Sequence, residues 1–168
     1  MVFGRRAVSL IVDVIRSMKY NRTVLHVDHD PAILKMVQQK LDDYGIHVVS
    51  IQDPLKVIPA IKQLGARVVL LDIDMPVKDG LTLLHEIKLF DAGIQVIMCT
   101  GMVSLNTVLR ATSLGAEACI FKPIKDLNEI TAAVDRAFEK IDRWWIALDD
   151  WLGRRESFHA IENQVLTP

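Results

Sequence analysis

The sequence lacks the features that mark several large protein classes. Its two cysteines, Cys99 and Cys119, are too few for a disulfide framework in 168 residues. Both lie in apolar, strand-like runs, which favours buried small side chains over a redox role and suits a reducing compartment. The net charge of -1 carries no basic excess of the kind that nucleic-acid binders show. No apolar run approaches the ~20 residues of a membrane helix. We therefore expect a cytoplasmic protein with no nucleic-acid partner and no membrane span.

From residue 23 the chain alternates short apolar runs with longer amphipathic ones. The expected strands cover residues 23–27, 46–51, 67–71, 94–99 and 117–121. The expected helices cover residues 31–44, 54–64, 80–90 and 104–114, with a fifth from about residue 126. Five such units predict an α/β protein with a doubly wound parallel sheet.

Helix boundaries carry their own signals. Asp30-Pro31 and Asp53-Pro54 each combine an N-cap carboxylate with a proline in the first helical position. Gly45, Gly65 and Gly115 stand where three of the helices should end.

Polar side chains gather where the expected strands end. The first strand is followed by Asp28-His29-Asp30, the third by Asp72-Ile73-Asp74, the fourth by Thr100-Gly101 and the fifth by Lys122-Pro123. In a doubly wound sheet these carboxyl ends form the ligand-binding edge. Clustered carboxylates can hold a hard cation such as Mg²⁺, and a carboxylate beside it can attack phosphorus. A cation, an ammonium and a hydroxyl can then stabilise the phosphoryl oxygens.

In their order along the chain, four segments resemble the receiver domain of two-component response regulators. They are residues 24–31, 69–80, 96–101 and 115–123, and the second, VLLDIDMPVKDG, is the most specific. The resemblance implies a flavodoxin-like sheet of strand order 2-1-3-4-5.

The resemblance also implies roles for individual residues. Asp72 would be the phosphate acceptor, and Thr100 and Lys122 would contact the phosphoryl group. Mg²⁺ would be held by Asp28, Asp72 and the backbone carbonyl of Asp74, with His29 or Asp30 as a further ligand. No cofactor-binding residues are expected besides these. Gly101 would leave room for a phosphodonor, and the Lys122-Pro123 bond would be cis, a conformation found almost only before proline.

Two positions depart from the family pattern. His29 stands where a second acidic residue is usual, and imidazole suits transition metals better than Mg²⁺. Either the carboxylates still hold Mg²⁺ more weakly, or phosphorylation is impaired or pH-dependent. Cys119 occupies the place of an aromatic switch residue, so the output surface would signal by backbone shift or altered dimerisation. Asp74 lies close to the expected path of hydrolytic water.

The receiver pattern fills residues 21–140, and extensions flank it. Residues 1–20 read as an amphipathic helix, although Met18 leaves open that residues 1–17 are an over-extended gene start. Residues 141–168 read as a helical extension and tail. The expected fifth helix runs to about Leu152 with a heptad-like apolar stripe, and residues 153–168 read as a loose tail. The extension carries Trp144, Trp145 and Trp151, which either fold back locally or form a partner or homodimer surface.

These features predict a single-domain response regulator that accepts a phosphoryl group on Asp72. The donor would be a histidine kinase or phosphotransfer protein, and output would pass through contacts with a downstream protein. As an enzyme it would at most catalyse its own phosphorylation and dephosphorylation. The alternative is a pseudo-receiver, a non-phosphorylated interaction or dimerisation module, which His29 favours. A small flavodoxin-like enzyme would need a glycine-rich nucleotide or flavin signature that the sequence lacks.

Overall fold

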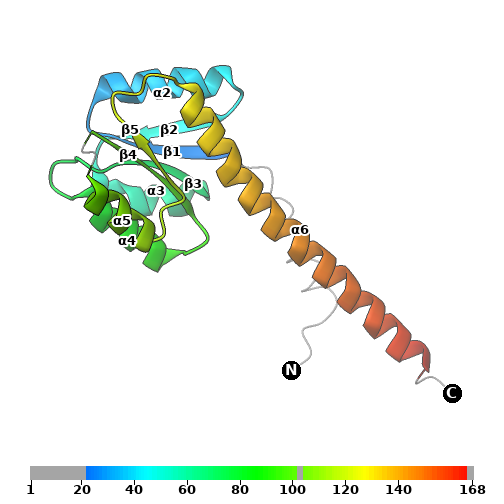
Figure 1. Ribbon diagram of the computed structural model, residues 1–168. Helices are drawn as coiled ribbons and strands as arrows, with labels where there is room; N and C mark the ends of the chain where they lie inside the picture. The colour runs from blue at the N-terminus through cyan, green and yellow to red at the C-terminus, as the bar shows by residue number, and fades with distance from the viewer. Residues whose placement is uncertain (1–21, 102–103, 166–168) are drawn as a thin grey trace. The chain divides into compact units, whose positions relative to one another are not determined.

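Figure 1 shows a computed structural model of the chain, which describes residues 22–101 and 104–165. The chain divides into two units, one of residues 21–138 and one that contains residues 139–165. The amphipathic helix expected over residues 1–20 lies outside the described residues.

A five-stranded parallel sheet forms the centre of the first unit. Its order is β2-β1-β3-β4-β5, which confirms the predicted fold class. The strands are β1 (Thr23–Val27), β2 (His47–Ile51), β3 (Val68–Asp72), β4 (Gln95–Thr100) and β5 (Ala118–Phe121). Each lies within one residue of the boundaries expected from the apolar runs.

Helices cover both faces of the sheet (Figure 1). The beginning of α6 and α2 lie on one face, and α3, α4 and α5 lie on the other. Their bounds are α2 (Pro31–Asp43), α3 (Val57–Leu64), α4 (Gly80–Phe90), α5 (Leu105–Ser113) and α6 (Asn128–Val165).

The helix expected over residues 54–64 begins with a separate 3-10 turn, η1 (Pro54–Lys56). Pro59 has no N–H with which to bond the carbonyl four residues earlier, so regular α-helical bonding starts late. Asp53 caps the turn, and its carboxylate accepts from the Leu55 N–H at 3.0 Å. Asp30 caps α2 in the same way by accepting from the Ala32 N–H at 2.8 Å. Both predicted N-caps are therefore confirmed.

The core has a layer on each face of the sheet. Leu25, Val27 and Leu71 pack in the cluster shared with α3, α4 and α5. Because side chains alternate along a strand, Val24 and His26 face the opposite layer, which α2 and α6 cover. Buried side chains of α2 and α6 in that layer are Leu34, Val37, Leu41, Ile130, Val134, Ala137 and Phe138. This two-sided burial explains why the strands are apolar along their whole length.

The α6 helix is longer than the sequence pattern indicated. It continues to Val165, so the expected end at Leu152 is wrong, as is the interpretation of residues 153–165 as a loose tail. One interior glycine, Gly153, costs a helix only about 1 kcal/mol, and the residues after it are mostly good helix formers.

The apolar stripe of α6 changes character along the helix. Ile130, Val134 and Ala137 are fully buried, whereas Trp144 and Trp151 are 73% and 53% exposed. The stripe therefore belongs to the receiver core only in its first part. Within the described part of the chain, no helix is long and apolar enough to cross a membrane.

Candidate functional site

The strand register brings the predicted polar residues to one edge of the sheet. Asp72 is the last residue of β3 and pairs with Cys99, so Thr100 lies one position further along β4. Thr100 in turn pairs with Phe121, the residue before Lys122. Asp28 directly follows β1, the other neighbour of β3.

Asp28, Asp72 and Lys122 converge at this edge. The Lys122 Nζ donates to Asp28 Oδ2 at 2.7 Å and to Asp72 Oδ1 at 2.9 Å. Both carboxylates are buried, with 0% and 1% of their residue surface exposed. Two buried carboxylates thus share one ammonium. The three groups carry a net charge of -1 when all are ionised (−2 + 1), and a further cation can balance this negative charge.

The lysine is held in its charged form. Burial acts to lower the pKa of the Lys122 ammonium, but its hydrogen bonds to Asp28 and Asp72 outweigh burial and raise it above the ordinary value. Lys122 is therefore an ammonium throughout the physiological pH range.

His29 occupies the other side of the carboxylate pair. Its Nδ1 lies 2.9 Å from Asp72 Oδ2 and 3.7 Å from Asp28 Oδ1. The two oxygens that face His29 are not those that Lys122 binds. Asp28, His29 and Asp72 form a group whose ligand atoms all lie within 4.8 Å of one another.

Asp30, the other further ligand that the sequence allowed, lies at the start of α2. Its carboxylate caps α2, and its own N–H donates to Asp28 Oδ1 at 2.9 Å. Asp30 thus fixes the loop and orients Asp28. Thr100 is buried at the neighbouring strand end, and the Asp74 side chain lies near Gly101, where a Cβ atom would stand 3.8 Å from Asp74 Oδ2.

The loop after β3 runs very close to the end of that strand. A Cβ atom on Gly80 would lie 2.1 Å from the backbone oxygen of Asp72, so only glycine allows α4 to begin there. In the same loop Val77 has a φ of 72°, a left-handed conformation that is strained for a β-branched residue. Such strain beside a candidate site is typical of functional loops.

In a comparison with known protein families, the model of the response regulator receiver domain matches residues 24–135 of this chain. The chain belongs to the response regulator receiver domain family. It is 31% identical over 121 residues to the chemotaxis protein CheY of Bacillus subtilis, covering 71% of this chain and 94% of that protein.

Solved structures give the same result. A CheY-like receiver domain protein from Methanospirillum hungatei JF-1 has a TM-score of 0.68 and 26% identity, over 72% of this chain and 96% of that one. The beryllofluoride-activated NtrC4 receiver domain dimer has a TM-score of 0.67 and 28% identity, over 71% of this chain and 98% of that one.

Cys119, which departs from the family pattern, and Cys99 are the two cysteines of the receiver domain. Cys119 is half-buried against the core, and burial raises the pKa of its thiol, which makes the reactive thiolate scarcer. Burial also raises the pKa of Cys99 to about 12. Both upward pKa shifts disfavour a redox role for these thiols. The Lys122-Pro123 bond is cis, as the resemblance implied.

The donor groups fit a divalent cation in part. Two buried carboxylates on one edge are suitable ligands for Mg²⁺, the ion that receiver domains typically bind. The imidazole of His29 is a nitrogen ligand, which Mg²⁺ does not favour.

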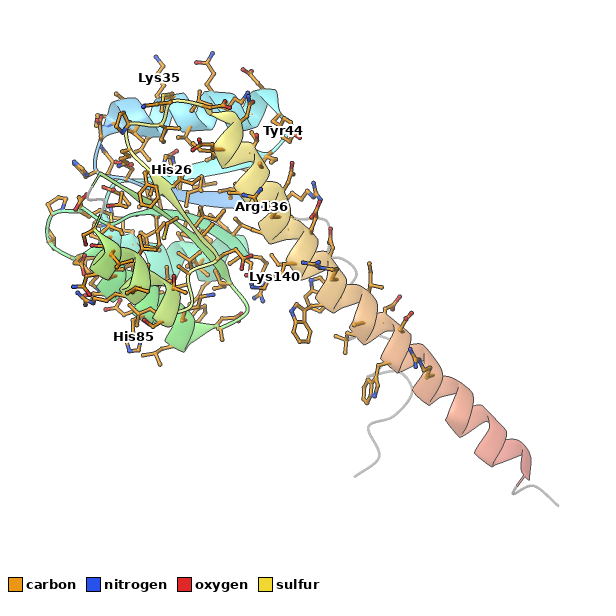
Figure 2. All side chains as sticks on the ribbon, in the orientation of Figure 1. His26, Lys35, Tyr44, His85, Arg136 and Lys140 are labelled. Atoms are coloured by element: carbon orange, nitrogen blue, oxygen red, sulfur yellow. The ribbon has the colours of Figure 1, made fainter. Side chains whose placement is uncertain are left out.

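Sequence reasoning did not single out His26. This residue of β1, labelled in Figure 2, is 1% exposed, and its Nδ1 is buried without a hydrogen-bond partner among the described residues. Burial lowers its pKa to about 4, with Lys122 adding to the effect and Asp28 and Asp72 opposing it. The signal available in the sequence was a histidine two residues before Asp28, on the same side of the strand.

Proposed function

We propose that this receiver domain accepts a phosphoryl group on Asp72 and signals through protein contacts. The observation that carries the proposal is the shared ammonium of Lys122, which binds the buried carboxylates of Asp28 and Asp72 at the carboxyl edge of the sheet. A structural ion pair alone would need one carboxylate; the second adds negative charge that suits a cation-dependent reaction.

In the proposed reaction a carboxylate oxygen of Asp72 attacks phosphorus. A P–O bond forms, and the bond from phosphorus to the donor breaks. With a phosphohistidine donor, the leaving imidazole nitrogen keeps the electron pair of the P–N bond. The product is an acyl phosphate on Asp72.

The surrounding residues stabilise charge on the transferred group. The Lys122 ammonium already donates to Asp72 Oδ1 at 2.9 Å, so it stands beside the oxygens that the phosphoryl group would bring. The buried hydroxyl of Thr100 would add a donor from the end of β4. Asp28, Asp72 and the Asp74 carbonyl would hold Mg²⁺, which when bound would neutralise charge on the phosphoryl oxygens.

Output would use the surface formed by α5, β5 and the first part of α6. Leu105 and Leu109 on α5 and Phe121 on β5 are large apolar side chains that are exposed there. Exposed apolar groups of this kind favour protein partners. We propose a histidine kinase or phosphotransfer protein as the donor, a downstream protein as the target and the cytoplasm as the location.

The test is phosphorylation by acetyl phosphate, in which the P–O bond to acetate breaks and acetate leaves. The full chain is incubated with the donor in the presence of Mg²⁺ or Mn²⁺, and intact mass is measured. We expect a gain of one phosphoryl group, absent in Asp72→Asn. The matched control Asp74→Asn removes a neighbouring carboxylate and should keep the gain.

No gain with either ion would contradict the proposal and would favour a non-phosphorylated interaction module. A gain that persists in Asp72→Asn would move the acceptor to another residue and would equally refute the assignment.

A further inference from the structure

We propose that the site around Asp72 is a mixed nitrogen–oxygen metal site that selects a first-row transition metal ion over Mg²⁺, with His29 as the residue that determines this preference. The inference rests on the metal site of the proposed function. It concerns which ion that site prefers, a property that can be measured without any phosphodonor.

The position of His29 is the first ground. Asp28 and Asp72 each give one oxygen to Lys122, and their other oxygens face the His29 Nδ1, at 3.7 Å and 2.9 Å. One nitrogen and two carboxylate groups therefore converge on the side away from the ammonium. An ion bound there would be separated from the positive charge of Lys122 by the carboxylates themselves.

The loop that carries His29 is fixed on both sides. The Asp28 N–H donates to the Ile51 carbonyl at 3.3 Å, and the Asp30 N–H donates to Asp28 Oδ1 at 2.9 Å. The Asp30 carboxylate is engaged in capping α2. The main chain of His29 is therefore held from both neighbours, and its side chain is 45% exposed, so the imidazole can turn toward an ion without disturbing the core.

The chemistry of the donors is the second ground. Mg²⁺ prefers an octahedron of oxygen ligands. It loses its bound water molecules reluctantly, so it usually keeps several of them. Imidazole nitrogen is a good ligand for first-row transition ions, whose affinities rise from Mn²⁺ through Co²⁺ to Cu²⁺. Where the family pattern has an acidic residue, His29 offers one oxygen ligand and one negative charge fewer, both of which Mg²⁺ uses. It supplies instead an imidazole nitrogen, which binds Co²⁺ more strongly than Mg²⁺.

The experiment compares metal affinities of the full chain after chelator treatment. Dissociation constants for Mg²⁺ and Co²⁺ are measured by titration calorimetry in wild type, His29→Asp and His47→Asn. His47 is an exposed histidine at the start of β2, the opposite edge of the parallel sheet from the site, which makes it a matched control. Circular dichroism of each variant establishes that the fold is intact.

We expect wild type to bind Co²⁺ more tightly than Mg²⁺. The ratio of Co²⁺ affinity to Mg²⁺ affinity should fall at least about tenfold in His29→Asp. Losing a residue that only hydrogen-bonds to a metal ligand already weakens metal binding by about that factor. His47→Asn should keep the wild-type ratio. In the Mn²⁺ complex, electron spin echo modulation from an imidazole nitrogen should be present in wild type and absent in His29→Asp.

An unchanged affinity ratio in His29→Asp, or no nitrogen modulation in wild type, would overturn the proposal and leave His29 as a hydrogen-bond partner of Asp72. Either result would leave the proposed function standing if Asp72 still takes up a phosphoryl group. If the chain shows the expected metal preference but takes up no phosphoryl group, the proposed function is rejected and the metal proposal stands.

Discussion

Acidification should destabilise this protein through one buried histidine. His26 is 1% exposed in β1, and burial lowers its pKa to about 4, against about 6.5 for a histidine in an unfolded chain. As the pH falls below 6.5, the unfolded chain takes up a proton on His26 while the folded chain does not. Protons therefore favour the unfolded chain until the pH reaches the folded-state pKa.

The size of the effect follows from the two pKa values. Each pH unit between them costs about 1.4 kcal/mol, so the full loss by pH 4 is about 3 kcal/mol. At pH 5, one and a half units below the unfolded value, the loss attributable to His26 is about 2 kcal/mol relative to pH 8. With a urea m-value of about 1–3 kcal/mol per molar, the unfolding midpoint should fall by roughly 1 M.

The perturbation that isolates this contribution is His26→Leu, because leucine fills a similar volume, suits the apolar layer under α2 and α6, and cannot titrate. Urea unfolding is followed by far-UV circular dichroism at pH 8 and pH 5. Other groups also titrate over this range, so the relevant quantity is the difference between wild type and variant. We expect wild type to lose about 2 kcal/mol more than His26→Leu.

The exposed His47→Asn serves as the control and should follow wild type at both pH values. Equal pH dependence of wild type and His26→Leu would show that His26 is not held neutral by burial and would refute the reasoning.

Two further predictions concern the loop between β3 and α4. Gly80→Ala should lower the free energy of unfolding by about 1–3 kcal/mol, the usual cost of overpacking. The new Cβ would meet backbone atoms of Asp72 and Ile73 at 2.1 and 2.7 Å. If urea titration showed the variant to be as stable as wild type, the loop would be able to move aside and the prediction would be wrong. Val77→Asn should raise the free energy of unfolding by about 1 kcal/mol, since Val77 is 87% exposed at a φ of 72° and asparagine tolerates this left-handed conformation better. Val77→Ala keeps a Cβ atom and should bring no such gain, so an equal gain in both variants would point to a cause other than backbone strain.

The sequence pattern was sufficient for the order and type of the elements. A short apolar run such as the one ending at Asp72 indicates a strand buried on both faces, and its alternation with amphipathic helical segments favours parallel strands covered by helices. The capping carboxylates of Asp30 and Asp53 act on N–H groups two residues away, so the helix starts were readable locally. The end of α6 could not be read from the sequence, because a single Gly153 in a run of helix formers gives only a weak stop signal.

By itself, then, the sequence determined the sheet, the strand ends and the set of polar residues placed there, because those depend on periodicity and on short-range hydrogen bonding. Tertiary structure alone decided how these residues meet. Lys122 meets Asp72 and Asp28, which lie 50 and 94 residues earlier in the chain, and His29 approaches Asp72 across 43 residues. The neutral state of His26 likewise depends on what buries it. Distances and burial between remote segments arise only when the chain packs, and they set the charge and the ligand chemistry of the site.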